Sequence, residues 1–395
     1  MKHRFLDLGM QPIANNFLPE IPEKENEFKF HLTVSYDDET SLVSLDDFVP
    51  PDLMFNENYV YHSSMSKTMR DHFSSAADHL KNILNPETVL EIGSNDGVFI
   101  RNFDSSKTIA IEPCGNFADL TNKMGYLTHC DFWSKEIVEK VLETGQKDLI
   151  FSANCVCHIQ DLDDAFSAVE KVLSKKGAFV FEDPSLYRMI KRGSYDQLYD
   201  EHAHVFSVTA LSNVLERNNM EIFRVESLDV HGGSNRIFAC RIGERSIDES
   251  VSYHISMEKE AGLDRLETYV NFGKQIETSK KQLTNLLKEL KRKGSKIISY
   301  GATSKSTTVF NYCGINGSTI DYIVDTTPSK QNKFSPGVHI PVIPPEEGMT
   351  EDVDYAFLGA WNFENEITAK EKDFLRRGRF ITHVPFVRII EAKDN

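Results

Sequence analysis

The stretch Val89-Leu90-Glu91-Ile92-Gly93-Ser94-Asn95-Asp96-Gly97-Val98-Phe99-Ile100 decides the fold class of this 395-residue chain. Its first residues are mostly apolar and β-prone, which is typical of a buried strand in a parallel sheet. Gly93 and Gly97 then bracket a tight polar turn, and Val98-Phe99-Ile100 begins an apolar pattern at helical spacing. We therefore expect a strand, a turn and a helix, with a ligand bound beyond the carboxyl end of the strand.

The turn favours S-adenosylmethionine over a dinucleotide. A dinucleotide fold has G-x-G-x-x-G, so that backbone can approach a pyrophosphate. Here the turn reads G-S-N-D-G, which lacks the middle glycine and carries Asp96, a charge that would repel a diphosphate. S-adenosylmethionine has no phosphate, but it has a sulfonium, an ammonium and a ribose diol that suit the carboxylates of Glu91, Asp96 and Glu112. An ordinary βαβ turn with solvated acids is the alternative.

Further polar residues follow the ends of the next predicted strands and would share the same edge of the sheet. Asn154 directly follows the predicted strand 148–153, and Asp131 lies between the strands predicted at 108–112 and 148–153. The predicted cofactor-binding set is Glu91, Gly93, Asn95, Asp96, Gly97, Glu112, Asp131 and Asn154.

Composition and charge limit the function classes. A net charge of −16 argues against a nucleic-acid groove. No apolar run is long enough for a membrane span, and the first residues lack a signal-peptide core, so we expect no membrane partner and a cytoplasmic protein. The six cysteines are spread along the chain, which favours free thiols over a disulfide framework.

Strands and helices alternate in two blocks, which predicts an α/β protein of two or three domains. The amino-terminal residues 1–68 differ in character: we expect a loop over 8–18 and a hairpin over 28–43. We expect helices over 65–84, 209–219 and 253–293, strands over 88–92, 108–112, 148–153 and 177–182, and a strand pair over 221–230 and 236–242. The second block has expected strands at 296–300, 320–325, 354–358 and 380–382.

The polar segment around Tyr199-Asp200-Glu201-His202-Ala203-His204 is the richest chemical cluster. A histidine is readily poised as a base near neutral pH, a carboxylate can orient it, and a tyrosine can donate to an oxyanion. A metal site on His202 and His204, or a polar loop without a role, are the alternatives, and no further residues with ligand spacing support the metal. His158, after the strand that ends at Asn154, and Lys305, in a turn before a helix, are further candidates that could also be structural.

Together these residues resemble the sugar C-methyltransferase family, which methylates the carbon beside the ketone of a nucleotide-linked 4-keto deoxysugar. The resemblance extends over nearly the whole chain. It includes Leu8-Gly9-Met10-Gln11-Pro12-Ile13-Ala14-Asn15, Tyr61-His62-Ser63-Ser64, Glu91 to Gly97, Asn154 with His158, Tyr199 to His202, Gly232-Gly233-Ser234, Tyr300-Gly301-Ala302 with Lys305, Ser335 to Val342, and Trp361-Asn362-Phe363.

This resemblance implies a Rossmann-like class I methyltransferase domain over 69–245, a second Rossmann-like α/β substrate domain over 246–395 and a small amino-terminal lobe over 1–68. It implies His202 as the base, with Tyr199, Glu201, His158 and Tyr61 as further catalytic residues. Ser234, Lys305 and Trp361 are expected to bind substrate. The expected partner is a nucleotide sugar, and the chain is expected to act as a monomer or homodimer.

One departure from the family concerns zinc. The family usually has an amino-terminal zinc site built from two cysteine pairs, whereas this chain begins after the place of the first pair and has no cysteine in the hairpin. We therefore expect no bound metal and a lobe held by packing alone. Ser306, where the family tends to have glycine, leaves the sugar or base contacts open. Methylation at oxygen or nitrogen, or a cofactor-binding subunit without catalysis, are the alternative functions.

Overall fold

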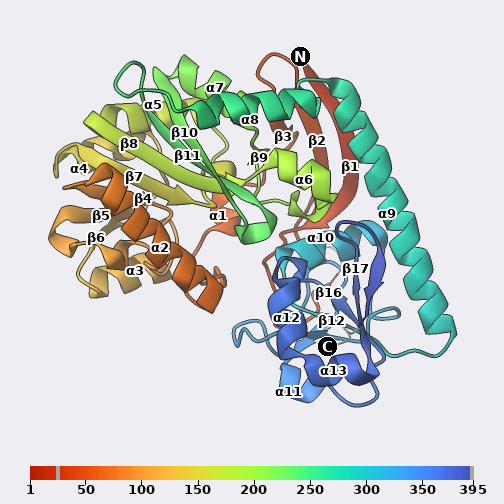
Figure 1. The fold of residues 1–395 in the computed structure, drawn as a ribbon. Coiled ribbons are helices and arrows are strands. Elements are labelled where there is room, and N and C mark those ends of the chain that lie inside the picture. The colour runs from red at the N-terminus through yellow and green to blue at the C-terminus, as the bar shows by residue number, and fades with distance from the viewer. Residues whose placement is uncertain (24–26, 392–395) are drawn as a thin grey trace.

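The computed structural model describes residues 1–23 and 27–391, and its strands form three sheets (Figure 1). The first is an antiparallel sheet of four strands near the amino terminus, ordered β1-β2-β3-β9. Its strands are β1 (Lys2–Pro12), β2 (Lys29–Asp37), β3 (Val43–Leu45) and β9 (His204–Val205). β9 comes from far along the chain, so the amino-terminal lobe does not close on its own residues.

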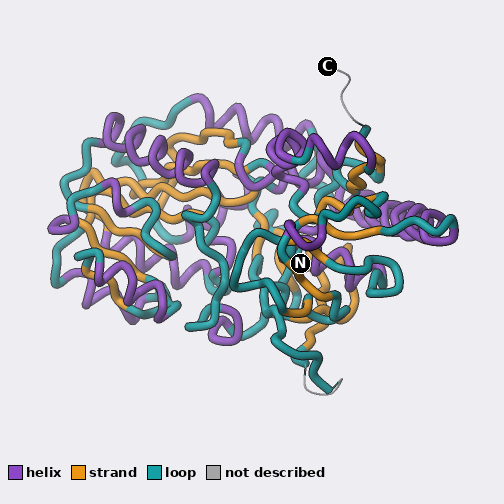
Figure 2. Tube along the Cα trace, turned by 90° about the horizontal axis from the view of Figure 1, so that it is seen from below, coloured by secondary structure: helices purple, strands orange, loops and turns teal. Residues whose placement is uncertain are grey.

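The central sheet has seven strands in the order β10-β11-β8-β7-β4-β5-β6. β4 (Val89–Ile92), β5 (Thr108–Ile111), β6 (Leu127–His129), β7 (Lys147–Ala153) and β8 (Leu173–Pro184) are parallel, and β10 (Met220–Leu228) and β11 (Ser234–Arg241) are antiparallel additions. Figure 2 shows helices on both faces of this sheet. They include α2 (Lys67–Leu84), α3 (Gly115–Lys123), α4 (Val138–Leu142), α5 (Leu162–Val172) and α7 (Val208–Arg217). The Rossmann-like prediction is confirmed.

The third sheet also has seven strands, in the order β14-β15-β13-β12-β16-β17-β18, and confirms a second α/β unit. Its strands are β12 (Ile297–Tyr300), β13 (Ile323–Val324), β14 (Lys333–Phe334), β15 (Pro341–Ile343), β16 (Tyr355–Leu358), β17 (Arg379–Thr382) and β18 (Arg388–Ile390). The helices of this unit are α10 (Ser304–Cys313), α11 (Pro345–Gly348), α12 (Glu364–Lys370) and α13 (Lys372–Arg377).

Short elements connect these layers. They are α1 (Pro51–Met54), α6 (Leu186–Arg192) and the 3-10 turns at Ile100–Asn102, Ser105–Lys107, Lys135–Ile137, Val156–His158, Tyr195–Gln197, Val230–Gly232 and Trp361–Phe363. None of the described helices has both the length and the apolar character that crossing a bilayer requires.

Three expectations about local structure were wrong. The helix expected over 253–293 is two helices, α8 (Glu249–Glu260) and α9 (Leu266–Arg292), because Gly262 adopts a left-handed φ of +78° that ends the first one. The start of the expected loop 8–18 is strand, since bulges in the β1–β2 register hide the two-residue alternation. After the Gly93–Gly97 turn there is only the 3-10 turn Ile100–Asn102 instead of a full helix.

The hydrophobic cores do not follow the order of the chain, because residues from distant parts of the sequence share one core. One core cluster joins the amino-terminal sheet, α9 and the third sheet, and it also contains side chains of residues 186–205, such as Leu186, Leu198 and Val205. A second cluster fills one face of the central sheet. Residues 186–205 leave the central domain through a neck in which Ser185 and Phe206 form a bridge. The predicted boundaries at 68/69 and 245/246 remain a prediction.

α9 runs beside β1 at one end and beside the third sheet at the other (Figure 1). Its Tyr269 ring stacks on Tyr36 of β2 at 4.3 Å and meets Phe5 of β1 at 5.3 Å. Its later residues Leu283 and Leu287 are buried in the same cluster as Ile297 of β12. The helix thus fastens the amino-terminal sheet to the carboxy-terminal domain.

Candidate active site

The Gly93–Gly97 turn has the conformation that its sequence requires. Gly93 and Gly97 have φ values of +73° and +74°, and a Cβ on Gly93 would lie 2.7 Å from Cys155 Sγ. The Glu112 carboxylate accepts hydrogen bonds from the backbone N–H of Asn95 (2.6 Å) and of Cys114 (2.9 Å). Glu112 therefore joins the ends of β4 and β5, and each of its oxygens keeps a lone pair for a ligand hydroxyl.

Residues 61–64 lie over this turn. The backbone N–H groups of Ser63 and Ser64 donate to Asn95 Oδ1 (2.9 Å) and Asp96 Oδ2 (3.0 Å), and Asn95 Nδ2 donates to the Tyr61 carbonyl (3.0 Å). Asn95 and Asp96 thus hold the covering segment, a role that we did not predict for them. The Tyr61 side chain is 38% exposed.

The turn still offers unused polar atoms to a cofactor. Among the described residues, Ser94 Oγ, Asp96 Oδ1 and Glu91 Oε2 are buried without a hydrogen-bond partner. Burial raises the pKa of Glu91 well above its ordinary value. Free polar groups beside an open glycine turn fit the ribose, ammonium and carboxylate groups of S-adenosylmethionine.

The remaining predicted cofactor residues lie at the same carboxyl edge. Asn154, with a φ of +49°, directly follows β7, and its N–H donates to the Glu182 carbonyl at 2.7 Å. Asp131 follows β6 and lies at the rim, where its Oδ2 is 3.4 Å from Lys140 Nζ. The edge is therefore assembled as expected, with Asp131 as its most peripheral member.

His202 is buried and has one ring nitrogen fixed. Its Nδ1 lies 2.6 Å from the Gln197 carbonyl oxygen, which can only accept, so Nδ1 carries the hydrogen and Nε2 has the lone pair. The Tyr199 ring lies 4.2 Å from the His202 ring. Burial is the largest cause that lowers the pKa of His202 well below its ordinary value. The arrangement provides a neutral imidazole with a free acceptor nitrogen.

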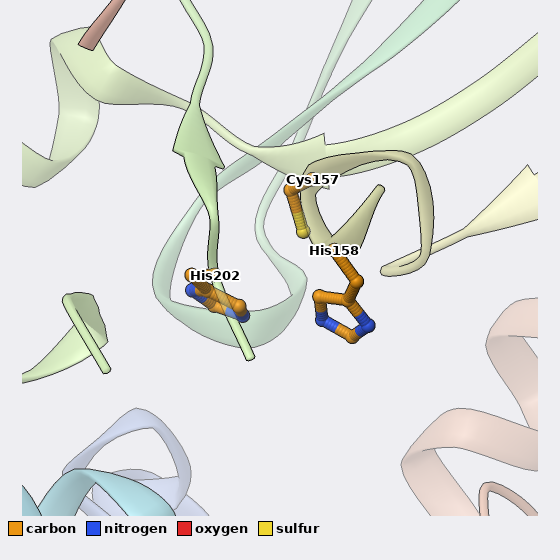
Figure 3. Close-up of side chains that lie close together, drawn as sticks. All are labelled: Cys157, His158 and His202. Atoms are coloured by element: carbon orange, nitrogen blue, oxygen red, sulfur yellow. The ribbon is translucent and has the colours of Figure 1, made fainter. Parts of the chain in front are cut away.

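His158 stacks between two rings. Its ring centroid is 5.3 Å from that of His202 and 5.3 Å from that of Phe55. Burial lowers the pKa of His158 to about 3, and its Nε2 has no partner among the described residues. Figure 3 shows His158 and His202 facing each other with Cys157 beside them. The two predicted histidines are thus brought together, although they are far apart in the chain.

Glu201 contacts two residues from the amino-terminal part of the chain. Its carboxylate accepts hydrogen bonds from Asn15 Nδ2 (2.7 Å) and from the Tyr59 hydroxyl (3.1 Å). Its neighbour Asp200 accepts from the Ala14 N–H at 3.0 Å, and burial and the Glu201 charge raise the pKa of Asp200 well above its ordinary value. Glu201 therefore links the amino-terminal lobe to the segment that carries His202 and does not itself bond to the imidazole.

Two lysines of the carboxy-terminal domain bring positive charge close to Glu201. Lys305, at the start of α10, feels the charges of Asp196 and Glu201, and Lys330 feels those of Asp325 and Glu201. Burial lowers the pKa of both lysines. Lys330 Nζ also donates to the Ala302 carbonyl at 2.7 Å. An anionic ligand would meet a local positive charge here within a protein of strongly negative net charge.

Trp361 and Ser234 were expected to bind substrate, but the polar group of each donates a hydrogen bond within the protein. The Trp361 indole is 6% exposed, and its Nε1 donates to Asp196 Oδ2 at 2.6 Å. The Ser234 hydroxyl donates to the Val230 carbonyl at 3.3 Å. A surface hollow of about 440 Å³ lies beside Trp361, and its lining includes Arg192 and Arg388 but not His202. Trp361 thus braces the 195–197 turn whose Gln197 holds the imidazole.

The histidine pair His202 and His204 does not form a metal site. His204 Nδ1 lies 2.7 Å from Ser44 Oγ and its Nε2 lies 3.2 Å from the Gln160 carbonyl, so both nitrogens are used. In the amino-terminal lobe, His3 and His31 each lie 2.8 Å from a carboxylate, Asp38 and Asp7. Residues 1–55 contain no cysteine, so the donors present there do not fit a zinc site of the cysteine type.

Sequence reasoning missed several residues that contact the predicted site residues. Tyr59 and Lys330 meet Glu201, Asp196 holds Trp361, and Cys157 adjoins the histidines. Only Cys157, next to His158, had a signal in its position. Lys330 is 129 positions beyond Glu201 by residue number, and no local pattern connects them.

Comparison with known proteins accounts for nearly the whole chain. Residues 1–55 match a putative zinc-binding domain, residues 61–225 a methyltransferase domain, and residues 229–385 a C-methyltransferase C-terminal domain. The C-methyltransferase NovU of Streptomyces niveus is 28% identical over 397 residues, which cover 98% of this chain and 94% of NovU.

Two solved methyltransferase structures resemble less than half of the chain. A possible histamine N-methyltransferase of Thermotoga maritima is 17% identical with a TM-score of 0.34, covering 44% of this chain and 89% of its own. A methyltransferase of Clostridium acetobutylicum is 14% identical with a TM-score of 0.35, covering 44% and 92%. Such scores add nothing to the fold, which rests on the sheet topology. From the three domain matches and the relative matched along its length, the chain is an S-adenosylmethionine-dependent methyltransferase that is similar over nearly all of its residues to C-methyltransferases.

Proposed function

We propose that this methyltransferase acts on carbon, at the position next to the ketone of a nucleotide-linked 4-keto deoxysugar. The observation that carries the proposal is the fixed tautomer of His202. A buried imidazole whose Nδ1–H is held by the Gln197 carbonyl presents Nε2 as a proton acceptor. A carbon acceptor needs such a base, because an α-carbon becomes nucleophilic only after it loses a proton.

The residues of this chain divide the work. His202 Nε2 takes the α-proton, and the Gln197 carbonyl supports the imidazolium that forms through its bond to Nδ1–H. Base catalysis of this kind is typically worth about 10²–10⁴-fold in rate. Tyr199, beside the imidazole, and the Lys305 ammonium supply donors for the enolate oxygen. S-adenosylmethionine, when bound, supplies the electrophilic methyl group.

Positioning falls to Glu201 and His158. Glu201 fixes the 199–202 segment against Asn15 and Tyr59, and it draws Lys305 and Lys330 toward the same space. His158 packs on His202 from the methyltransferase side. Holding two reactants in place can be worth several orders of magnitude in rate. Tyr61 completes the proposed catalytic set from the covering segment.

Positive charge and enclosure support the substrate class. Lys305 and Lys330 would suit the diphosphate of a nucleotide sugar, and the family resemblance points to the same class. Ser234 and Trp361 stay in the proposed substrate region as supports of its wall. A cytoplasmic protein, active as a monomer or homodimer, is part of this proposal.

Exchange of the α-proton tests the chemistry directly. The full chain is incubated in heavy water with the demethylated cofactor and a panel of nucleotide-linked 4-keto deoxysugars. We expect the matching sugar to gain deuterium at its α-carbon, and to gain a methyl group there when S-adenosylmethionine is supplied. Mass spectrometry and proton NMR measure both.

Matched histidine variants make the test specific. His202→Gln should lose exchange and methylation together, whereas His204→Gln, which changes a buried histidine turned away from the site, should keep both. Methylation that persists in His202→Gln would move the base elsewhere. Methylated product without α-proton loss would identify an oxygen or nitrogen acceptor and refute carbon methylation.

A further inference from the structure

Cys157, His158 and His202 form a cluster of three metal-ligating side chains (Figure 3). The Cys157 sulfur and one ring nitrogen from each histidine all lie within 4.8 Å of one another. It is the one group of three or more His, Cys, Asp or Glu ligands found with this spacing among the described residues. The cluster lies in the proposed active site, but methyl transfer as proposed above uses only His202 as a base and leaves the thiol without a role.

The surroundings of these side chains suit a metal ion. His202 donates its Nδ1–H to the Gln197 carbonyl, which is the outer bond that metal-bound histidines usually make and which leaves Nε2 free to coordinate. His158 Nε2 is buried without a partner, and its ring is held against Phe55. Cys157 is 1% exposed. The site is thus enclosed and has its outer support already in place.

The donor set selects the kind of ion. One thiolate and two imidazoles suit Zn²⁺ or another borderline or soft cation, and they do not suit Mg²⁺ or Ca²⁺. Bonds of about 2.0–2.3 Å in tetrahedral geometry place ligand atoms about 3.5 Å apart. Closing from 4.8 Å requires shifts of about 1 Å, which side-chain torsions can supply.

We propose that Cys157, His158 and His202 bind one Zn²⁺ ion, and that the bound ion switches the enzyme off. Binding transfers the Cys157 thiol proton to solvent, forms one sulfur–zinc and two nitrogen–zinc bonds, and leaves a fourth position for water. The inhibitory part rests on the proposed function, because the Nε2 lone pair of His202 cannot bind zinc and accept a proton at the same time. The binding part does not depend on it.

The three ligands come from parts of the chain that belong to two different hydrophobic cores. Cys157 lies in the core of the central sheet, whereas His202 lies between Leu198 and Val205, which belong to the core shared with the amino-terminal sheet and α9. An ion held by all three would connect the two bodies. A ligand that binds only the folded protein raises its stability by mass action, so the metal should also raise the unfolding temperature.

Cobalt spectroscopy tests the binding without any substrate. The full chain is freed of metal with a chelator and titrated with Co²⁺, which reports a thiolate ligand through a near-ultraviolet charge-transfer band. We expect saturation at one Co²⁺ per chain, displacement of the band by Zn²⁺ and a higher unfolding temperature with either ion.

Cys157→Ala should abolish the band, whereas Cys240→Ala, which removes another fully buried thiol in the central sheet, should retain it. His158→Gln, as a second variant that keeps the thiol, should weaken Co²⁺ binding by more than the about 10–100-fold typical of losing an outer partner. No saturable band in the wild type, or a band that survives in Cys157→Ala, would overturn the site.

The deuterium-exchange assay then tests the switch. One equivalent of Zn²⁺ should stop exchange in the wild type and in Cys240→Ala, and a chelator should restore it. Stoichiometric binding with undiminished exchange would overturn the inhibition while leaving the site. If the metal-free protein shows no exchange with any sugar, the proposed function fails, and the cobalt result still decides the binding.

Discussion

The joint between the amino-terminal sheet and the methyltransferase domain should weaken in acid, because His204 holds it. Its Nδ1 meets Ser44 Oγ of β3 at 2.7 Å and its Nε2 meets the Gln160 carbonyl at 3.2 Å. Burial lowers the pKa of His204 from 6.5 to about 4. The unfolded chain therefore binds a proton at this residue below pH 6.5, whereas the folded chain binds it only near pH 4.

The sign and size of the effect follow from this difference. A depressed histidine pKa costs stability as pH falls from 6.5 toward the folded value, at about 1.36 kcal/mol for each pH unit. At pH 5 the cost from His204 is about 2 kcal/mol relative to pH 7. A glutamine in its place keeps a donor and an acceptor but cannot take up the proton.

Urea unfolding of the wild type and of His204→Gln at pH 7 and pH 5 measures this cost. The other buried histidines are present in both proteins, so their contributions cancel in the comparison. We expect the variant to be less stable at pH 7, because glutamine fits the two bonds less well. The difference should shift by about 2 kcal/mol in favour of the variant at pH 5. A difference that does not change with pH would refute the reasoning.

Three further predictions concern the site. Trp361→Phe removes the N–H that Asp196 accepts, so it should cost about 1.5–3 kcal/mol in urea unfolding and lower kcat more than it changes KM. Glu112→Gln should weaken binding of S-adenosylmethionine at least about tenfold in calorimetry, since the carboxylate orders the turn; unchanged affinity would exclude that role. The lowered pKa of His202 should place the acid limb of kcat/KM below pH 6.5, and a limb at or above that pH in the pH–rate profile would contradict it.

Much of the fold was predictable because its signals are local. The apolar strand before Gly93 and the acidic Glu112 after the next strand are β4 and β5 with their carboxyl ends in register, and the pair meets through the Asn95 N–H. Strands of the third sheet likewise follow short apolar runs. The errors arose where backbone geometry overrides the pattern, as at the β1 bulges and at Gly262.

The site was only partly predictable, for a different reason. His202, Tyr199, Glu201 and His158 were named from residue chemistry and resemblance, and the structure brings them to one place. Their partners depend on tertiary contacts: Asn15 and Tyr59 reach Glu201 across more than 140 positions, as the separations of 186 and 142 show. No sequence periodicity predicts contacts between residues so far apart. The hydrogen bond from Trp361 to Asp196, over a separation of 165 positions, is another contact of this kind.

The long helix α9 joins two of the three sheets into a single body. At 27 residues it measures about 40 Å, and it is fastened to the amino-terminal sheet at one end and to the carboxy-terminal domain at the other. The bridge between Ser185 and Phe206 lies where the chain passes from the central sheet into this body. His202 belongs to this body and His158 follows β7 of the central sheet, so their rings stack across the contact between the two. Any substitution that disturbs this contact should therefore also disturb the stacking of the two histidines.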